Sequence, residues 1–256
     1  MGRVIIKQPE ELAVMRKSGQ LLASVFRYLD DQITAGMSTM DINNLAEDFI
    51  INRLGTRPAS KGQYGFPYVL NTSVNHVVCH GIPSATQILV PGDIVNVDIT
   101  LEQGGFIADS SKMYAIGDIS PLAKRLVDTT YDAMWAGIRT VKPGATLGDV
   151  GHAIQQQATQ QGYTIVREYC GHGIGRTMHE EPAVLHYGRA GEGLVLQEGM
   201  TFTIEPMVNQ GKAKVKQKKD GWTVVTADKK LSAQWEHTIA VTATGYEVLT
   251  LRDEER

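Results

Sequence analysis

The sequence is poor in cysteine and contains no long apolar run. Cys79 and Cys170 are its two cysteines, whereas a secreted chain of 256 residues would more often carry several pairs, so we expect both thiols to be reduced. No stretch approaches about 18 consecutive apolar residues, which excludes a membrane-spanning helix. The amino terminus is charged at Arg3 and Lys7 and lacks the apolar core of a signal peptide. These absences predict a cytoplasmic protein.

Five ionisable residues stand in segments whose neighbours are mostly apolar or glycine. The chain has 42% hydrophobic residues and a net charge of -3, so it can bury a large core. A single acid on a strand is usually solvated, and a single histidine is more often structural than a ligand. Four acids on apolar strands, however, would each carry a desolvation cost unless they share cations. The five residues are Asp98, Asp109, His172, Glu205 and Glu236.

Asp98 and Asp109 lie on two predicted strands that are joined by a tight turn. Residues 94–101 alternate with a period of two, and residues 106–113 form the returning strand after a turn that contains glycine. If the two-residue loop is Gln103–Gly104, Asp98 lies directly opposite Asp109. If the loop lies one residue later, the two carboxylates are diagonal neighbours on one face. Either register brings like charges together, at a cost of roughly 4 kcal/mol for a separation of about 4 Å, which a cation would offset.

The other three residues complete a candidate set of metal ligands. Glu205 lies in an extended segment before Pro206, and Glu236 lies in the alternating segment 234–241. His172 lies among three glycines, which allow close approach of the backbone. Carboxylates with one imidazole and no thiolate favour Mn(II), Fe(II) or Co(II) over structural zinc. A rival Cys2His2 zinc site, formed by the two cysteines with the neighbouring His80 and His172, lacks finger-like spacing and leaves the four acids unexplained. Two divalent ions balance four carboxylates, and a hydroxide between them would be the nucleophile.

The five residues and their flanks resemble those of type I methionine aminopeptidases over nearly the whole chain. The motifs that carry the resemblance are Val78–Pro83, Asp98 with Asp109, Gly171–Gly175, His179–Pro182, Thr203–Met207 and Ser232–Thr238. The resemblance implies metal-dependent removal of the initiator methionine from nascent proteins whose second residue is small. It implies two divalent ions (Co, Mn, Fe(II) or Zn), of which Asp98 chelates one, Asp109 and Glu236 bridge both, and His172 with Glu205 completes the second site.

The same resemblance implies roles for side chains around the metals. His80 would hydrogen-bond near the scissile amide or act as an acid, His179 would stabilise the developing oxyanion or position the carbonyl, and Glu205 would shuttle a proton. The substrate pocket would be lined by His80, Phe66, Met178, His179 and Trp222.

Two further expectations concern the substrate pocket and a monovalent ion. The resemblance implies that Ser60, Gln63 and Asn71 stand at wall positions, and a thioether gains most from an apolar pocket, so the sequence leaves the strength of methionine selectivity open. The resemblance also implies a monovalent cation held by backbone carbonyls, which would map to Asn75, Val77 and Ser232.

A faint internal repeat relates the two halves of the chain. Ser38–Asp41 and Thr146–Asp149 both fit a capping box that opens a helix. We expect helices at 10–31, 39–53, 121–139 and 147–161, which alternate with hairpins. This pattern indicates an α+β protein with a single catalytic domain, 1–256, in two similar halves of about 1–117 and 118–256. The resemblance implies the pita-bread fold, in which helices cover a curved, mostly antiparallel sheet whose inner face carries the ligands.

One strong charge run consists of the five lysines between positions 212 and 219. Alternating Ala213 and Val215 suggest an exposed strand before the Asp220–Gly221 turn, most simply a solvated hairpin. The alternative is a contact between Lys212–Lys219 and ribosomal RNA, because a co-translational enzyme works at the tunnel exit. We expect a monomer whose partners are nascent peptide N-termini and, under this alternative, the ribosome.

Three functions are compatible with these residues. The first is the dimetal aminopeptidase that the resemblance implies. The second is an Xaa-Pro aminopeptidase or dipeptidase, which shares the five ligands but normally carries an additional amino-terminal domain. The third is a non-catalytic, ribosome-associated peptide-binding protein on the same fold, although such proteins typically lose ligands and all five are present here.

Overall fold

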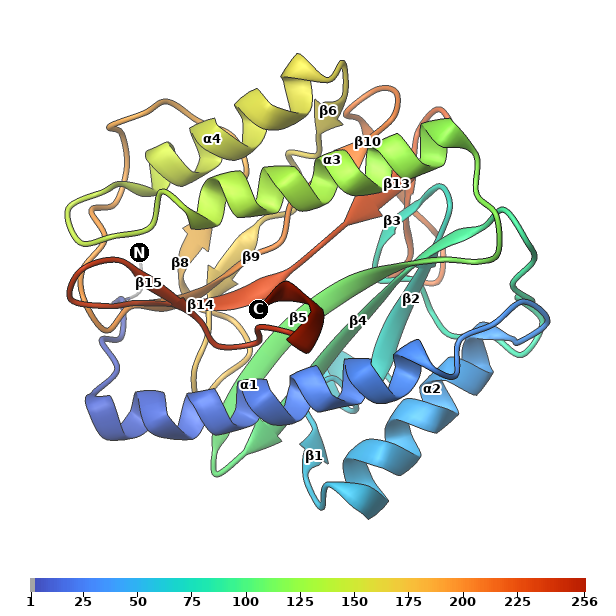
Figure 1. The fold of residues 1–256 in the computed structure, drawn as a ribbon, viewed down its shortest axis with the longest axis horizontal. Coiled ribbons are helices and arrows are strands. Elements are labelled where there is room, and N and C mark those ends of the chain that lie inside the picture. The colour runs from blue at the N-terminus through green and yellow to red at the C-terminus, as the bar shows by residue number, and fades with distance from the viewer. Residues whose placement is uncertain (1–2) are drawn as a thin grey trace.

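Two pairs of helices cover one side of a set of curved sheets in the computed structural model, which describes residues 3–256 (Figure 1). The first pair is α1 (Pro9–Asp30) and α2 (Thr39–Asp48), and the second is α3 (Pro121–Ile138) and α4 (Leu147–Gln160). The predicted helices are confirmed to within one residue at each bound except one. The helix predicted over 39–53 ends as an α-helix at Asp48 and continues as the π-helix η1 (Phe49–Arg53).

Both predicted capping boxes are present. The Ser38 hydroxyl accepts a hydrogen bond from the Asp41 amide at 3.2 Å, and the Asp41 carboxylate accepts one from the Ser38 amide at 2.8 Å. Thr146 and Asp149 repeat this exchange at 3.2 and 2.7 Å. Each box satisfies two amides that a helix leaves without partners. The two halves of the chain therefore begin their second helix in the same way.

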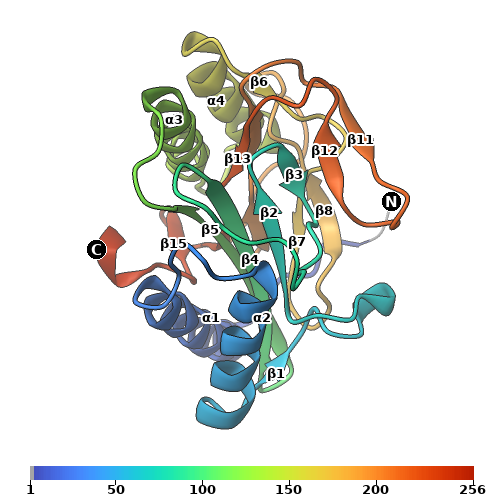
Figure 2. The same ribbon diagram turned by 90° about the vertical axis from the view of Figure 1, so that its right-hand side faces the viewer.

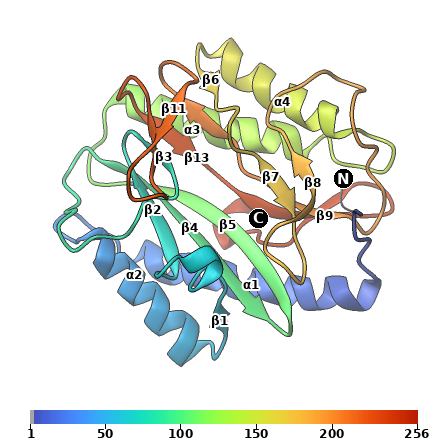
Figure 3. The ribbon, with the colours of Figure 1, turned by 180° about the vertical axis from the view of Figure 1, so that it is seen from behind.

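The strands of residues 3–256 form four sheets, which Figures 2 and 3 show from the side and from behind. The first sheet contains β1 (Arg57–Pro58), β2 (Leu70–Val74), β4 (Ile94–Gln103) and β5 (Phe106–Ala115). The second contains β6 (Thr164–Ile165), β10 (Met207–Asn209) and β13 (Ser232–Gln234). The third contains β3 (Val77–Cys79), β11 (Val215–Gln217) and β12 (Val224–Thr226). The fourth contains β7 (Gly171–Gly173), β8 (Glu180–Val184), β9 (Thr201–Ile204), β14 (His237–Val241) and β15 (Tyr246–Val248).

The β4–β5 hairpin has the later of the two registers that the sequence allowed. Gln103 pairs with Phe106, so the two-residue loop is Gly104–Gly105, and both glycines have positive φ values, of 60° and 78°. Positive φ at both central residues is what the common hairpin turn requires. Asp98 consequently pairs with Ser111, and the carboxylates of Asp98 and Asp109 are diagonal neighbours.

The single strand predicted over 234–241 is divided in the structure. β13 ends at Gln234 and β14 begins at His237, because β13 pairs with β10 whereas β14 pairs with β9 in another sheet. At the break, Glu236 forms a β-bridge with Ser111 of β5. The second half of the chain is thereby joined to the first half beside Glu236.

The apolar core lies between the helices and the sheets. One cluster contains residues of α1, α2, β2 and β4, including Phe26, Ile42 and Ile99, and a second packs α3 and α4 against the strands of the other half. The predicted exposed hairpin is confirmed: β11 and β12 project at the edge of the molecule (Figure 2), and the five lysines of residues 212–219 are exposed. None of the helices within residues 3–256 is long and apolar enough to cross a membrane.

Candidate metal centre and active site

A cavity of about 440 Å³ lies among strands of both halves of the chain. Figure 3 shows the side of the molecule away from the helices, where β4, β5, β7 and β9 lie. All ten residues predicted for the site line this cavity, and they are Phe66, His80, Asp98, Asp109, His172, Met178, His179, Glu205, Trp222 and Glu236. The structure therefore brings together side chains that are up to 170 positions apart, from Phe66 to Glu236.

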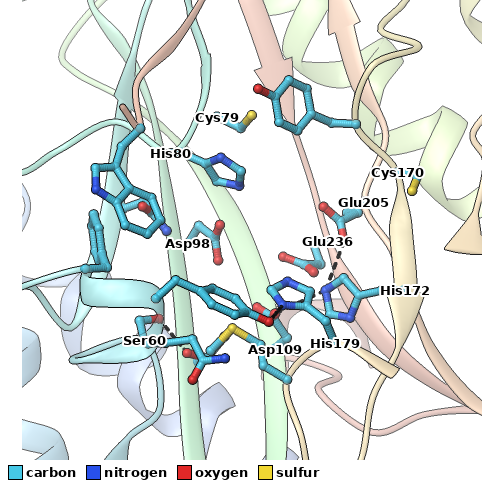
Figure 4. Close-up of a pocket in the computed structure, with 18 of the residues that line it drawn as sticks. Ser60, Cys79, His80, Asp98, Asp109, Cys170, His172, His179, Glu205 and Glu236 are labelled. Carbon is cyan, nitrogen blue, oxygen red and sulfur yellow. Dashed lines mark hydrogen bonds and ion pairs between the residues drawn. The ribbon is translucent and has the colours of Figure 1, made fainter. Parts of the chain in front are cut away.

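The five candidate ligands converge from β4, β5, β7, the end of β9 and the break between β13 and β14 (Figure 4). Ligand atoms of Asp109, His172 and Glu236 all lie within 4.8 Å of one another. Nε2 of His172 is 3.7 Å from the Asp109 carboxylate and 3.5 Å from the Glu205 carboxylate. Asp98 contributes from β4, where its carboxyl interacts with that of Asp109. Glu236 and Asp109 lie between Asp98 on one side and His172 on the other.

Two glycines set the position of His172, as the sequence predicted. A Cβ on Gly171 would lie 2.4 Å from the carbonyl oxygen of Thr203, and one on Gly173 would lie 2.1 Å from that of Glu181. Nδ1 of His172 is 3.0 Å from the carbonyl oxygen of Gly173. A proton on Nδ1 that is donated to this carbonyl leaves the lone pair of Nε2 directed at the carboxylates, which is the arrangement of a metal-binding histidine.

Glu205 is oriented by three neighbours, one of which could not be identified from the sequence. The Thr203 hydroxyl donates a hydrogen bond to Oε1 at 2.7 Å, and the Gln234 side-chain amide donates to Oε2 at 3.4 Å. The backbone amide of Glu205 donates to Nε2 of His186 at 3.1 Å. His186 is fully buried, and burial lowers its pKa to about 3, so it is a neutral acceptor. It belongs to none of the motifs that pointed to the site.

The acids are held where their ionised forms are costly. Burial raises the pKa of Asp98 to about 7 and that of Glu205 to about 8. Burial, followed by repulsion from the neighbouring carboxylates, raises the pKa values of Asp109 and Glu236 well above their usual range. Burial lowers the pKa of His172 to about 4. A divalent cation among these groups would favour the ionised acids and the neutral imidazole together.

A second observation also indicates that these side chains could bind a divalent metal. Oδ1 of Asp109 is buried and has no hydrogen-bond partner in the described part of the chain. A buried carboxylate oxygen without a partner is costly, because it has lost its water without replacement. A cation supplies the missing interaction, and oxygen with imidazole ligands suits Mn, Fe, Co or Zn.

His80 and His179 face the same cavity from opposite sides (Figure 4). Burial lowers the pKa of His80 to about 4, and its ring packs edge-on against Tyr169 at 5.4 Å. Burial also lowers the pKa of His179, whose ring centroid is 4.4 Å from that of His172. Both imidazoles are therefore neutral near pH 7, and each offers one donor and one acceptor.

Sequence reasoning missed several lining residues. They include Tyr64, Glu168 and Tyr169. Both cysteines, Cys79 and Cys170, also line the cavity, as their positions beside His80 and His172 had indicated. Tyr64 has a φ of 51°, and such left-handed backbone at a tyrosine leaves no sequence pattern.

The wall of the cavity combines an aromatic pair with polar side chains. The rings of Phe66 and Trp222 lie 5.0 Å apart, edge to face, and Met178 is buried beside the cavity. Ser60 and Thr100 share a hydrogen bond of 2.5 Å between their hydroxyls. Asn71 pairs with Asp98 across β2 and β4, and its side chain hydrogen-bonds the Asp98 carboxyl. Hydrogen bonds to Thr100 and Asp98 therefore satisfy part of the hydrogen-bonding capacity of Ser60 and Asn71.

The three residues expected at a monovalent cation site lie on neighbouring segments. The carbonyl oxygen of Asn75 accepts a hydrogen bond from the Ser232 amide at 2.9 Å. Asn75 has a φ of 55°, and Val77 opens β3, which pairs with β12.

Comparison with known proteins agrees with this geometry. Residues 13–243 match the model of metallopeptidase family M24. The chain is 46% identical to methionine aminopeptidase of Escherichia coli K12 over 252 residues, which cover 98% of this chain and 96% of that protein. It is 48% identical to the enzyme of Rickettsia prowazekii over 247 residues, 96% of this chain and 95% of that one.

Solved structures give the same result. The crystal structure of methionine aminopeptidase from Rickettsia prowazekii superposes with a TM-score of 0.95 at 47% identity, over 97% of this chain and 100% of that chain. Prolidase from Pyrococcus horikoshii shares the fold, with a TM-score of 0.76 at 21% identity, and 64% of its length is covered. The pita-bread fold predicted from the sequence is therefore confirmed, and this chain belongs to metallopeptidase family M24 and, within it, to the methionine aminopeptidases.

Proposed function

We propose that this protein removes the N-terminal methionine of nascent peptides whose second residue is small, with two divalent metal ions at one centre. The observation that carries the proposal is the convergence of four carboxylates and one imidazole on a single cavity in a chain that is 46% identical to a methionine aminopeptidase. Asp98, Asp109, His172, Glu205 and Glu236 would hold the ions, and two divalent charges would balance four carboxylates. Bound there, the metals would activate water for attack on a peptide carbonyl.

The other polar residues of the cavity suit the reaction of a peptide bond. His80 and His179 are neutral hydrogen-bond donors on opposite sides of the centre, where they could bind the scissile amide and stabilise its carbonyl oxygen. Glu205, hydrogen-bonded by Thr203 on one oxygen, has a carboxyl that can receive a proton and pass it on. We assign to His80 and His179 the contacts with the scissile amide, and to Glu205 the proton transfer.

The cavity wall supports selection of methionine. Phe66, Met178 and Trp222 offer an apolar and polarisable surface to a thioether. Asn71 is engaged by Asp98, so its amide presents less unsatisfied polarity than the sequence suggests. Gln63 also lines the cavity with a polar side chain, and we expect it to weaken discrimination between methionine and leucine.

Further features of the proposal concern ions, surroundings and organisation. The residues suit Co, Mn, Fe(II) or Zn, and carbonyls of Asn75, Val77 and Ser232 would hold a monovalent cation. We infer that the protein is a cytoplasmic monomer. We also infer one catalytic domain of two halves, about 1–117 and 118–256, because the cavity takes residues from both halves. Contact with the ribosome would use the exposed lysines of residues 212–219.

A peptide assay tests the proposal. Met-Ala-Ser, Leu-Ala-Ser and Met-Pro-Ser would be incubated with protein that has been chelated and then supplied with Mn(II) or Co(II). We expect methionine release from Met-Ala-Ser that chelation abolishes and metal restores, and no release by a His172→Ala variant. Cleavage that is indifferent to the chelator would contradict the proposal. A preference for an Xaa-Pro bond would instead favour the prolidase-like alternative, whose fold this chain shares.

A further inference from the structure

A short C-terminal segment packs against the helix side of the sheet, behind the metal centre. Residues 250–255, dark red in Figure 1, lie beside β5 and β14 and between α1 and α3. Arg252 in this segment is only 1% exposed, which is rare for an arginine. The hydrogen-bond partners of its two Nη atoms are therefore protein groups, whereas its Nε has no hydrogen-bond partner among the described residues.

Arg252 joins the two halves of the chain. Nη1 donates hydrogen bonds to the Ser110 hydroxyl and to the Ser111 carbonyl, both at 3.2 Å, on β5. Nη2 lies 3.1 Å from Nε2 of His237 at the start of β14 and donates to the Glu255 carboxylate at 2.8 Å. One side chain thus contacts strands from residues 106–115 and from residues 237–241.

Ser110 extends this contact to the backbone of Glu236. Its hydroxyl donates a hydrogen bond of 2.7 Å to the carbonyl oxygen of Glu236, while it accepts one from Arg252. The backbone bridge between Ser111 and Glu236 is longer, with hydrogen bonds of 3.2 and 3.4 Å. Side chains alternate along a strand, so Ser110 faces Arg252 while Asp109 faces the cavity.

A second pair of hydrogen bonds fixes Asp109 itself. The Thr238 hydroxyl donates to the carbonyl oxygen of Asp109 at 2.7 Å and accepts from its amide at 3.1 Å. The Thr238 amide in turn donates to the Thr250 hydroxyl at 3.1 Å. The C-terminal segment therefore contacts both strands next to the residues that carry the carboxylates.

We propose that Arg252 and Ser110 are positioning residues that fix the spacing between the carboxylates of Asp109 and Glu236, and so set the affinity of the centre for divalent metal. This inference rests on the proposed function in one respect, namely that these two carboxylates bind metal. The two acids come from different halves and repel each other, and the sheet is interrupted at Glu236, so a link behind them is needed to hold their spacing. Partners that orient metal ligands typically change metal affinity by about 10–100-fold when removed.

The test compares two buried serines. Ser110→Ala removes the hydroxyl that joins Arg252 to the Glu236 carbonyl and keeps every charge. Ser18→Ala is the matched control, because Ser18 is also 0% exposed and its hydroxyl also bonds backbone carbonyls, at Val14, Gln103 and Phe106. Ser18 joins α1 to the far end of the β4–β5 hairpin, away from the metal centre. Co(II) binding to chelated protein would be measured by calorimetry, and stability by urea unfolding.

We expect Ser110→Ala to weaken Co(II) binding about tenfold and Ser18→Ala to leave it unchanged, although both variants are less stable than the wild type. Arg252→Lys, which keeps the charge but not the forked geometry, should weaken binding at least as much in the fraction that folds. Equal Co(II) affinity of the wild type and Ser110→Ala would overturn the inference. Metal binding with no aminopeptidase activity in the wild type would overturn the proposed function. The inference about Arg252 and Ser110 would still be decided by the difference in Co(II) affinity between the wild type and Ser110→Ala.

Discussion

The hydroxyl of Tyr64 lies 3.1 Å from Nδ1 of His179, and the two rings are stacked with centroids 5.6 Å apart. Tyr64 is 69% exposed and has a φ of 51°, so it is held over the histidine from the rim of the cavity in a backbone conformation that a tyrosine rarely adopts. A hydroxyl that donates to Nδ1 leaves the imidazole proton on Nε2. Tyr64 would thereby keep His179 as a hydrogen-bond donor from its other nitrogen.

Tyr64→Phe removes this hydrogen bond and keeps the ring. One exposed hydrogen bond is worth about 0.5–1.5 kcal/mol, so we expect kcat on Met-Ala-Ser to fall about twofold to tenfold with little change in KM. Tyr68→Phe is a suitable control, because Tyr68 packs on Phe66 without a contact to His179 among the described aromatic pairs. An unchanged kcat in Tyr64→Phe would mean that the hydroxyl does not set the state of His179.

The residue next to His179 is fixed by a buried ion pair. Lys7 and Glu180 form it, with side chains 2% and 5% exposed, and Glu180 also accepts hydrogen bonds from the amides of Arg176 and Thr177. Lys7→Met leaves the carboxylate buried without its cation, and we expect the free energy of unfolding to fall by about 3–5 kcal/mol in urea. The exposed pair of Arg16 with Glu247 is the control, because Arg16→Met should cost less than about 1 kcal/mol.

A companion change separates charge from packing at the same place. Glu180→Gln in the Lys7→Met background removes the unpaired charge and keeps an acceptor for the amides of residues 176 and 177. We expect it to recover part of the lost stability. A double variant no more stable than Lys7→Met would show that the lysine acts through its packing and not through its charge.

The features that could be predicted from the sequence are those that repeat locally. The helices follow from apolar spacing, and the capping boxes at Ser38 and Thr146 follow from residues three positions apart. The ligands could be found because each acid interrupts an apolar or alternating segment, and the flanking motifs matched a known family. The hairpin needed the structure to choose between two registers, because Gln103–Gly104 and Gly104–Gly105 are both acceptable turns.

The features that could not be predicted depend on contacts between distant residues. Arg252 meets Ser110 over 142 positions, Lys7 meets Glu180 over 173, and Tyr64 meets His179 over 115. Nothing in the segments around these residues distinguishes them from exposed charges or loop aromatics. The break between β13 and β14 had the same cause, because alternation continues through it while the pairing strand changes.

Metal-free protein should lose stability as the pH rises from about 6.5 to 8. Burial raises the pKa of Asp98 to about 7 and that of Glu205 to about 8, against roughly 4 in an unfolded chain. Within this window the folded state holds protons that the unfolded state has lost, so the free energy of unfolding falls with rising pH. His80 and His172 act oppositely, since burial lowers their pKa values to about 4, but this effect is half lost at about pH 6.5, the pKa of an unfolded histidine, and is small above about pH 7.5.

Thermal melting of chelated protein at several pH values measures this effect. We expect the Tm to decline between about pH 6.5 and 8, and the decline to be smaller in Asp98→Asn, which removes one of the titrating groups. Co(II) should abolish it, because a bound cation keeps the carboxylates ionised at every pH in this range. A Tm that rises over the same interval in chelated protein would contradict the assignment of raised pKa values to these acids.

The lysine hairpin gives a prediction that is independent of the catalytic centre. Lys214 and Lys216 are exposed on and beside β11, and binding to ribosomal RNA through them would be sensitive to salt. We expect Lys214→Glu with Lys216→Glu to lower cosedimentation with ribosomes. The slope of the logarithm of the binding constant against the logarithm of the salt concentration should become less steep, by about 0.7–0.9 for each phosphate that the hairpin no longer neutralises. Release of methionine from a free peptide should not change, because the hairpin lysines lie outside the cavity lining.

The same two charge reversals at Lys124 and Lys142, which are exposed in the second half of the chain, control for net charge. Equal cosedimentation of the two double variants and the wild type would leave the hairpin as a solvated surface.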